Sequence, residues 1–289
     1  MIPDIAELFV EPLRYDFMQR ALIVSILVGV MCPVIGAYVV ARGRAFMGDA
    51  LAHSVLPGMG IGLLATGTAL IAAVPTGVAI ALLMGFISRR TGSSEDTSIG
   101  IVFAGMFALG LVMLSSPFYI NTFLELRNTQ APNIEDLLIG EILGVSTGEV
   151  YLSLGLALLV IAGLYVFHRH LVYTTFDPVG AEVVGIKVRF VEYILLALLA
   201  LVIVISIQAA GIVLVMAMLI TPAATGFLLA RRFVGVMVIG AVIGVLSAIV
   251  GMYLSFHANM PTGPIMALVA TAMFGLAALK GEWTKRSAD

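Results

Sequence analysis

Charged residues are scarce in this 289-residue chain. Asp, Glu, Lys and Arg make up 11% of it and hydrophobic residues 61%, whereas a typical soluble domain has roughly 25% charged residues. This number of charges is too small to cover a water-facing surface. The composition therefore predicts an all-α, polytopic transmembrane helical bundle. The net charge of −2 gives no indication of a nucleic-acid partner.

The chain also has only one cysteine and no phosphate-binding motif for a nucleotide. The single cysteine, Cys32, lies in an apolar run, which excludes an intrachain disulfide framework or a zinc-binding cysteine cluster and predicts core packing. The phosphate-binding pattern G-x-x-x-x-G-K-[ST] does not occur. If the protein depends on ATP, we therefore expect a separate partner subunit to hydrolyse it.

Nine apolar segments are long enough to span a membrane, because about 20 helical residues rising roughly 1.5 Å each cross the hydrocarbon core. They lie at 17–41, 46–67, 69–88, 97–117, 149–168, 190–208, 209–230, 233–255 and 263–280. The uncharged run 194–230 is too long for one span, and QAAG at 208–211 is the predicted break. We expect residues 1–16 to form an amphipathic segment at the membrane surface, and 17–289 to form one transmembrane domain.

The basic residues predict the orientation of these spans. With the C-terminus in the cytoplasm, the outside segments hold only Arg14, Arg20 and Arg127 of the 15 Lys and Arg residues, as the positive-inside rule expects. Nine spans place the termini on opposite sides, and eight spans with both termini inside is the alternative. The largest outside segment, 118–148, is acidic, and NIEDLLIGEILGVS within it predicts a short surface helix.

The segment GDALAHSVLPG, residues 48–58, places Asp49 and His53 inside a predicted span. At i and i+4 both side chains lie on one helix face, and ionisable groups in a membrane indicate function because they are costly there. Carboxylate and imidazole ligands suit Mn²⁺, Fe²⁺ and Zn²⁺. Two ligands do not close a site, but a two-fold dimer would supply four. An intrahelical Asp–His hydrogen bond is the structural alternative. We expect the neighbouring small residues to serve helix packing: Gly48, Gly58, Gly60 and Gly62.

A second candidate lies in the inside loop 169–189. Around TTFDPVGAEVVGIKVRF, Asp177 can cap a helix, Pro178 suits its first position and Gly185 can end it. We predict a short cytoplasmic helix near 176–186 that contacts a soluble partner, with Ala181, Val183 and Val184 as apolar contacts and Glu182 as a pairing charge.

Weaker candidates lie near the inner interface. His168 and His170 flank Arg169, where a solvated cluster is the expected arrangement. Glu192 is expected to reach solvent from the interface. His257, in HANMPTG on the outside, is predicted to be an ordinary loop residue.

Three segments together resemble the permeases of the metal-cation (manganese, zinc and iron) ABC importers. MQRALIVSILVGVMCPVIGAYVVARGRAFMGDALAHSVLPG at 18–58 is similar to the start of that family, with Ala52 where serine is usual. FDPVGAEVVGI resembles its coupling helix. LVMAMLITPAATGFLL resembles its later PAATA motif, with Gly226 in place of the last alanine.

The resemblance implies a function and a set of partners. It implies a permease of the bacterial cytoplasmic (inner) membrane that moves a divalent cation by alternating access, with no permanently bound cofactor. The expected partners are a second permease subunit, two cytoplasmic ATP-binding subunits and an extracytoplasmic metal-binding protein. It places Asp49 and His53 on the cation path, and it supports the ATPase contact predicted for Asp177, Pro178, Glu182, Val184 and Gly185.

Two other classes of protein remain as alternatives at this point. An intramembrane metalloenzyme would need more ligands in one chain, and no HExxH pair occurs. An ion-coupled secondary carrier would be expected to show inverted repeats, and none is convincing. Among the cations we favour manganese, then zinc, then iron, because EPLRYDFMQRAL looks most like the manganese-type members.

Overall fold

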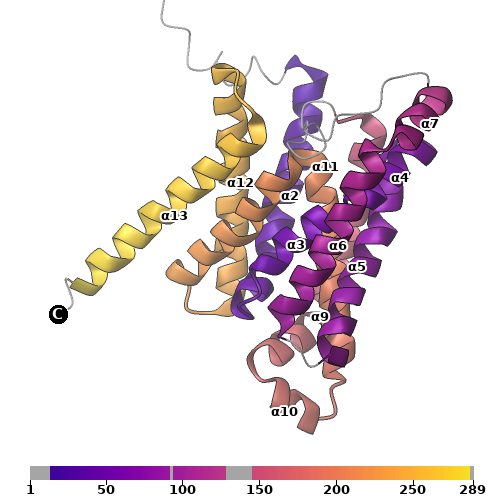
Figure 1. Ribbon diagram of the computed structural model, residues 1–289. Coiled ribbons are helices and arrows are strands. Elements are labelled where there is room, and N and C mark those ends of the chain that lie inside the picture. Colours follow the sequence, from indigo (N-terminus) through magenta and orange to yellow (C-terminus); the bar gives the residue numbers. More distant parts are fainter. Residues whose placement is uncertain (1–13, 92–93, 128–144, 287–289) are drawn as a thin grey trace, which may run out of the picture.

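The computed structural model describes residues 14–91, 94–127 and 145–286, and this part of the chain is a bundle of helices (Figure 1). Seven of its helices are long and apolar enough to cross a membrane. They are accompanied by a shorter apolar helix at 214–229 and by a pair of short helices in the second predicted span. The predicted all-α bundle is confirmed.

The helix bounds follow the predicted spans closely at most ends. The long helices are α2 (Asp16–Ala41), α5 (Ala69–Thr91), α6 (Glu95–Ser115), α9 (Thr147–Phe176), α11 (Val188–Leu229), α12 (Phe233–Ala258) and α13 (Thr262–Arg286). The shorter ones are α3 (Phe46–Ser54), α4 (Leu56–Thr66), α7 (Pro117–Arg127) and α10 (Pro178–Val183). In Figure 1, α10 and the C-terminal end of α13 lie at the lower end of the bundle, and α7 lies at the upper end.

The second predicted span, 46–67, is two helices rather than one. α3 ends at Ser54 and α4 begins at Leu56, with the buried Val55 between them. Pro57 explains the break, because proline has no N–H to donate to the carbonyl of His53 four residues earlier and its ring crowds that carbonyl. The helix is therefore interrupted directly after the segment that carries Asp49 and His53.

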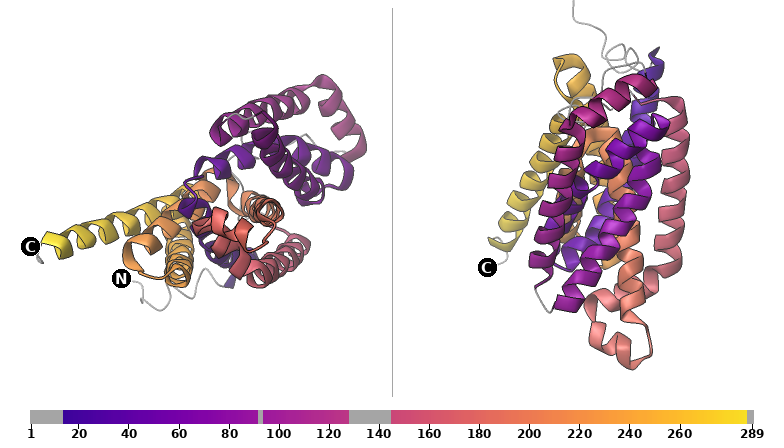
Figure 2. Two further views of the ribbon diagram at one scale, coloured as in Figure 1. Left: turned by 90° about the horizontal axis from the view of Figure 1, so that it is seen from below. Right: turned by 45° about the vertical axis from the view of Figure 1, so that its right-hand side comes forward.

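The break predicted at 208–211 is also present. Gly211 lies inside α11 with φ 74° and ψ 172°, which is not helical, and its two flanking parts are separate helical segments. α11 packs against α2, α3, α5, α9, α12 and α13, and is thus the centre of the bundle. α13 lies at the edge and projects away from the other helices in the view from below (Figure 2).

Several glycines serve close helix packing, as expected. A Cβ on Gly48 would lie 2.5 Å from Cδ2 of Leu219, and one on Gly58 would lie 2.6 Å from the side chain of Thr76. Cys32 is fully buried, with its Sγ 3.1 Å from Oγ of Ser206, which confirms core packing for the only cysteine.

Some predictions about the loops were wrong or lie outside the described residues. α9 continues to Phe176, so 169–176 is helical and not part of a loop. α7 occupies 117–127, where no helix was predicted. Most of the predicted amphipathic segment 1–16 and of the predicted surface helix in 118–148 falls on residues 1–13 and 128–144, outside the described part.

Candidate metal site and inner coupling surface

Asp49 and His53 lie one turn apart on α3 and their side chains are in contact. Nδ1 of His53 is 3.1 Å from Oδ1 of Asp49 and 3.1 Å from the Asp49 carbonyl oxygen. Each side chain keeps 25% of its surface exposed, although their helix neighbours Ala50, Leu51 and Ala52 are fully buried. The predicted intrahelical contact is therefore present, on the partly exposed face of a helix that buries its other residues from Met47 to Ser54.

The same spacing suits a shared cation. Ligand nitrogen and oxygen atoms lie about 2.0–2.2 Å from a first-row metal such as zinc, so two ligands at right angles are about 3 Å apart. The measured 3.1 Å between Nδ1 and Oδ1 is close to that separation. A cation could thus replace the contact between the two side chains without a large movement of α3.

Two phenylalanines of α6 hold the imidazole of His53. Its ring meets Phe103 and Phe107 edge to face, with centroids 5.7 and 5.3 Å apart, and the two phenyl rings stack on each other at 5.8 Å. Such contacts fix a ring orientation at a cost in free energy if lost. Nothing in the sequence pattern around His53 indicated these partners.

One chain does not complete a metal site in the part that the structure describes. Within residues 14–91, 94–127 and 145–286, no group of three or more His, Cys, Asp and Glu side chains could hold a metal ion. Asp49 and His53 therefore supply two ligands per chain, and any further ligand must come from outside this set.

The short helix predicted near 176–186 is present as α10. The Asp177 carboxylate accepts a hydrogen bond from the Gly180 N–H at 2.8 Å, Pro178 occupies the first helical turn, and Gly185 follows the helix with φ 88°. Val183 and Val184 are 83% and 69% exposed. Ala181, however, is fully buried, so its predicted role as a contact for a partner is wrong.

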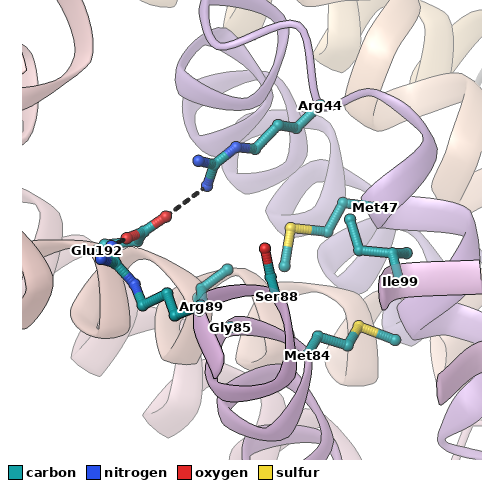
Figure 3. Close-up of a pocket in the computed structure, with 9 residues that line it drawn as sticks. Arg44, Met47, Met84, Gly85, Ser88, Arg89, Ile99 and Glu192 are labelled. Carbon is teal, nitrogen blue, oxygen red and sulfur yellow. Dashed lines mark hydrogen bonds and ion pairs between the residues drawn. The ribbon is translucent and has the colours of Figure 1, made fainter. Parts of the chain in front are cut away.

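Glu192, in the second turn of α11, forms a charged cluster that the sequence did not predict. Its carboxylate accepts from Arg44 Nη1 at 2.8 Å and pairs with Arg89 at the end of α5, so one guanidinium group comes from the turn between α2 and α3 and the other from a helix (Figure 3). Glu192 is only 8% exposed, which corrects the expectation that it reaches solvent. A small cavity of about 20 Å³ beside the cluster is lined by Met47, Met84 and Ile99, among others.

His168 is not part of a merely solvated cluster. Its Nδ1 lies 2.7 Å from the hydroxyl of Tyr38, so it joins α9 to α2 inside the bundle. His257 lies exposed in the last turn of α12, where its Nδ1 meets the Tyr253 carbonyl at 2.8 Å, so the prediction of a loop residue was wrong.

Comparisons with known proteins agree with this architecture. The model of the ABC 3 transport family matches residues 14–281. The manganese transport system membrane protein MntC of Halalkalibacterium halodurans is 41% identical over 93% of this chain and 89% of its own length. The chelated iron transport system membrane protein YfeD of Yersinia pestis is 36% identical over 92% of this chain and 86% of its own.

The likeness extends to three dimensions. The structure of PsaBC from Streptococcus pneumoniae in complex with Fab contains a chain that superposes with a TM-score of 0.81, at 29% identity and with 95% of both chains covered. A putative metal-chelate type ABC transporter in an inward-facing conformation shares the fold at 14% identity, with a TM-score of 0.69 over 96% of this chain and 91% of that one. These matches exclude the intramembrane enzyme and the secondary carrier. The chain belongs to the ABC 3 transport family, and it is a multi-pass membrane permease subunit of an ABC transporter.

Proposed function

We propose that this permease imports a divalent first-row metal cation, manganese first, and that Asp49 and His53 bind it on the way. Its relatives include a manganese transport protein and a chelated-iron transport protein. The observation that supports the site is the 3.1 Å contact between the Asp49 carboxylate and the His53 imidazole. An Asp–His pair is a suitable ligand set for Mn²⁺, Fe²⁺ and Zn²⁺.

A homodimer completes the site. Two ligands from each of two copies would give two carboxylates and two imidazoles around one cation, a number that a first-row metal accepts. The open face of α3, with both side chains a quarter exposed, is the surface that would meet the second copy. In this proposal an extracytoplasmic metal-binding protein delivers the cation to the dimer.

ATP is hydrolysed by two separate cytoplasmic subunits that contact α10. This helix presents Val183 and Val184 to its surroundings, and Glu182 beside them can pair with a basic rim. The proposal places α10, the basic helix ends and the C-terminus in the cytoplasm of a bacterial cell, in accordance with the excess of Lys and Arg at that end.

Manganese uptake by vesicles that contain the assembled transporter tests the metal site. We expect Asp49→Ala and His53→Ala each to abolish uptake, because in a homodimer either change removes both ligands of one type and leaves only two of the four. A matched control is His257→Ala, which removes an exposed histidine that also contacts the carbonyl four residues earlier. Normal uptake by Asp49→Ala or His53→Ala would reject the assignment.

Cysteine crosslinking tests the ATPase contact. In a Cys32→Ser background, Glu182→Cys on the exposed side of α10 should form a crosslink to the ATPase subunit. Ala258→Cys at the opposite end of the bundle is the control and should not. If the crosslink forms instead through the end of α5, near Arg90, the coupling surface has been misplaced.

A further inference from the structure

The turn between α2 and α3 is closely hydrogen-bonded. The Gly43 N–H donates to the Val40 carbonyl and the Arg44 N–H to the Val39 carbonyl, each at 3.0 Å. Gly43 has φ 67°, so this is a Schellman motif, in which a left-handed residue ends the helix. The backbone of the turn is therefore fixed, and its two arginine side chains, Arg42 and Arg44, leave it in defined positions.

Arg42 binds the chain just before α10. Its guanidinium donates to the hydroxyls of Thr174 and Thr175 at 3.2 and 3.1 Å, in the last turn of α9. Both threonines also donate to the Leu171 carbonyl, so their oxygens are oriented to accept from Arg42. Asp177, the cap of α10, follows two residues later.

Arg44 binds the chain just after α10. Its Nη1 donates to the Glu192 carboxylate at 2.8 Å, in the second turn of α11. The turn 42–45 thus forms hydrogen bonds to the end of α9, which precedes α10, and to the start of α11, which follows it. It also leads directly into α3, where Asp49 lies five residues after Arg44.

We propose that the Arg42–Gly43–Arg44 turn is the mechanical link between the ATPase-contacting helix α10 and the metal-binding helix α3. This inference rests on the proposed function of both helices. When α10 is displaced, Thr174, Thr175 and Glu192 move with it. Because Arg42 and Arg44 are bonded to these residues, the start of α3 moves as well. Arg42 and Arg44 are positioning residues in this scheme and do not touch the cation.

The two contacts form a short, continuous route of charge-assisted hydrogen bonds, which are stronger than neutral ones. Coupling between the two helices is tested by the effect of a change in the turn on ATP hydrolysis and cation import together. The useful quantity is the number of ATP molecules hydrolysed for each cation imported. A residue that only stabilises the fold changes both rates together and leaves this ratio unchanged.

The test uses the full complex of permease, ATPase and binding protein in proteoliposomes, with manganese as the probe. In Arg44→Gln and Arg42→Gln the ratio of ATP hydrolysed to manganese imported should rise roughly 10-fold, which corresponds to about 1.4 kcal/mol of lost coupling. Arg44→Gln still leaves Glu192 paired with Arg89, so the complex should assemble. Manganese binding at Asp49 and His53 should persist.

Arg89→Gln is the matched control. It removes the other guanidinium from the same carboxylate but leaves both contacts of the turn in place, so the ratio should stay near the wild-type value. Asp49→Ala in the same assay separates the two proposals. If Asp49→Ala transports manganese normally, the proposed metal site fails, whereas loss of uptake in Asp49→Ala with an unchanged ratio in both arginine variants rejects the link alone.

The paired change Thr174→Val and Thr175→Val keeps the test valid if an arginine variant does not fold. It removes the two hydroxyls that accept from Arg42 and preserves side-chain size. The ratio should rise as in Arg42→Gln, and combining the two changes should add no further effect, because both remove one interaction. A proportional fall of hydrolysis and uptake, or additive effects, would overturn the proposal.

Discussion

Asp49 and Glu192 are two carboxylates of one bundle with opposite surroundings. Glu192 is 8% exposed and lies between Arg44 and Arg89, so its charge is more than balanced. The Asp49 side chain is 25% exposed, and its contact is with His53, which carries a charge only when protonated. The first carboxylate is enclosed by cations of the protein, while the second has a histidine and an open side.

This difference separates a structural charge from one that is available to a substrate. A buried carboxylate with two guanidinium partners is satisfied and joins helices, and breaking it leaves charges without compensation. A carboxylate beside an imidazole keeps lone pairs for a passing cation, and its cost in a membrane protein indicates function. The comparison therefore predicts that the two positions fail in different assays.

The largest effect is expected for Asp49→Asn. The amide keeps the size of the side chain and can still contact His53, but it loses the charge that attracts a divalent cation. Manganese uptake should fall on the order of 100-fold or more, as expected for about 3 kcal/mol of lost binding, while the thermal stability of the purified complex changes by less than about 0.5 kcal/mol. If Asp49→Asn instead lowers the stability of the complex, Asp49 is a structural charge like Glu192.

A loss of stability is expected for Glu192→Gln. Arg44 and Arg89 then lack a counter-charge, and thermal unfolding should show a loss of roughly 2–3 kcal/mol. This is less than a fully buried pair costs, because the Arg89 side chain is 38% exposed. The control is Arg90→Gln, which removes the neighbouring guanidinium that lies over Phe86, 5.7 Å from the ring centroid. Equal stability of the two variants would contradict the structural role.

The features on the Asp49 side of this contrast could largely be predicted from the sequence, whereas the surroundings of Glu192 could not. The spans follow from hydrophobic length, the break at Gly211 from a residue that does not continue a helix, and the contact of Asp49 with His53 from their spacing of four. All of these depend on residues close together in the chain. The cap of α10 by Asp177 is local for the same reason. The break before Pro57 was not predicted, because 46–67 has the length and composition of one apolar span.

The other missed features are contacts between distant segments. Glu192 is separated by 148 residues from Arg44, so its burial depends on how α5, α11 and the turn between α2 and α3 pack, which no local pattern specifies. The same holds for the phenyl rings around His53, and for His168, which is 130 residues from Tyr38. α9 extends past the predicted end at 168 because a polar, basic turn can continue a helix beyond the apolar part of a span.

A moderate effect is expected when the aromatic support of His53 is removed. Phe103→Ala and Phe107→Ala each remove an edge-to-face contact with the imidazole. Such a contact contributes about 0.5–1.5 kcal/mol, so the manganese concentration for half-maximal uptake should rise roughly 2- to 12-fold. Ile101→Ala, at a 61% exposed position of the same helix, should leave it unchanged. If all three variants behave alike, the rings do not position His53.

The smallest effect is expected at the second histidine, His168, and it extends the comparison from carboxylates to imidazoles. His168 meets the hydroxyl of Tyr38 at 2.7 Å, so it is satisfied by an uncharged partner that cannot be exchanged for a cation without breaking the contact between α2 and α9. Tyr38→Phe removes that hydroxyl and should lower stability by about 1 kcal/mol, the value of a typical hydrogen bond. Manganese uptake per assembled complex should be unchanged, because neither residue lies on α3. If Tyr38→Phe loses uptake but keeps normal stability, His168 also takes part in transport. A hydrogen bond to a neutral partner would then not identify a histidine of this bundle as structural.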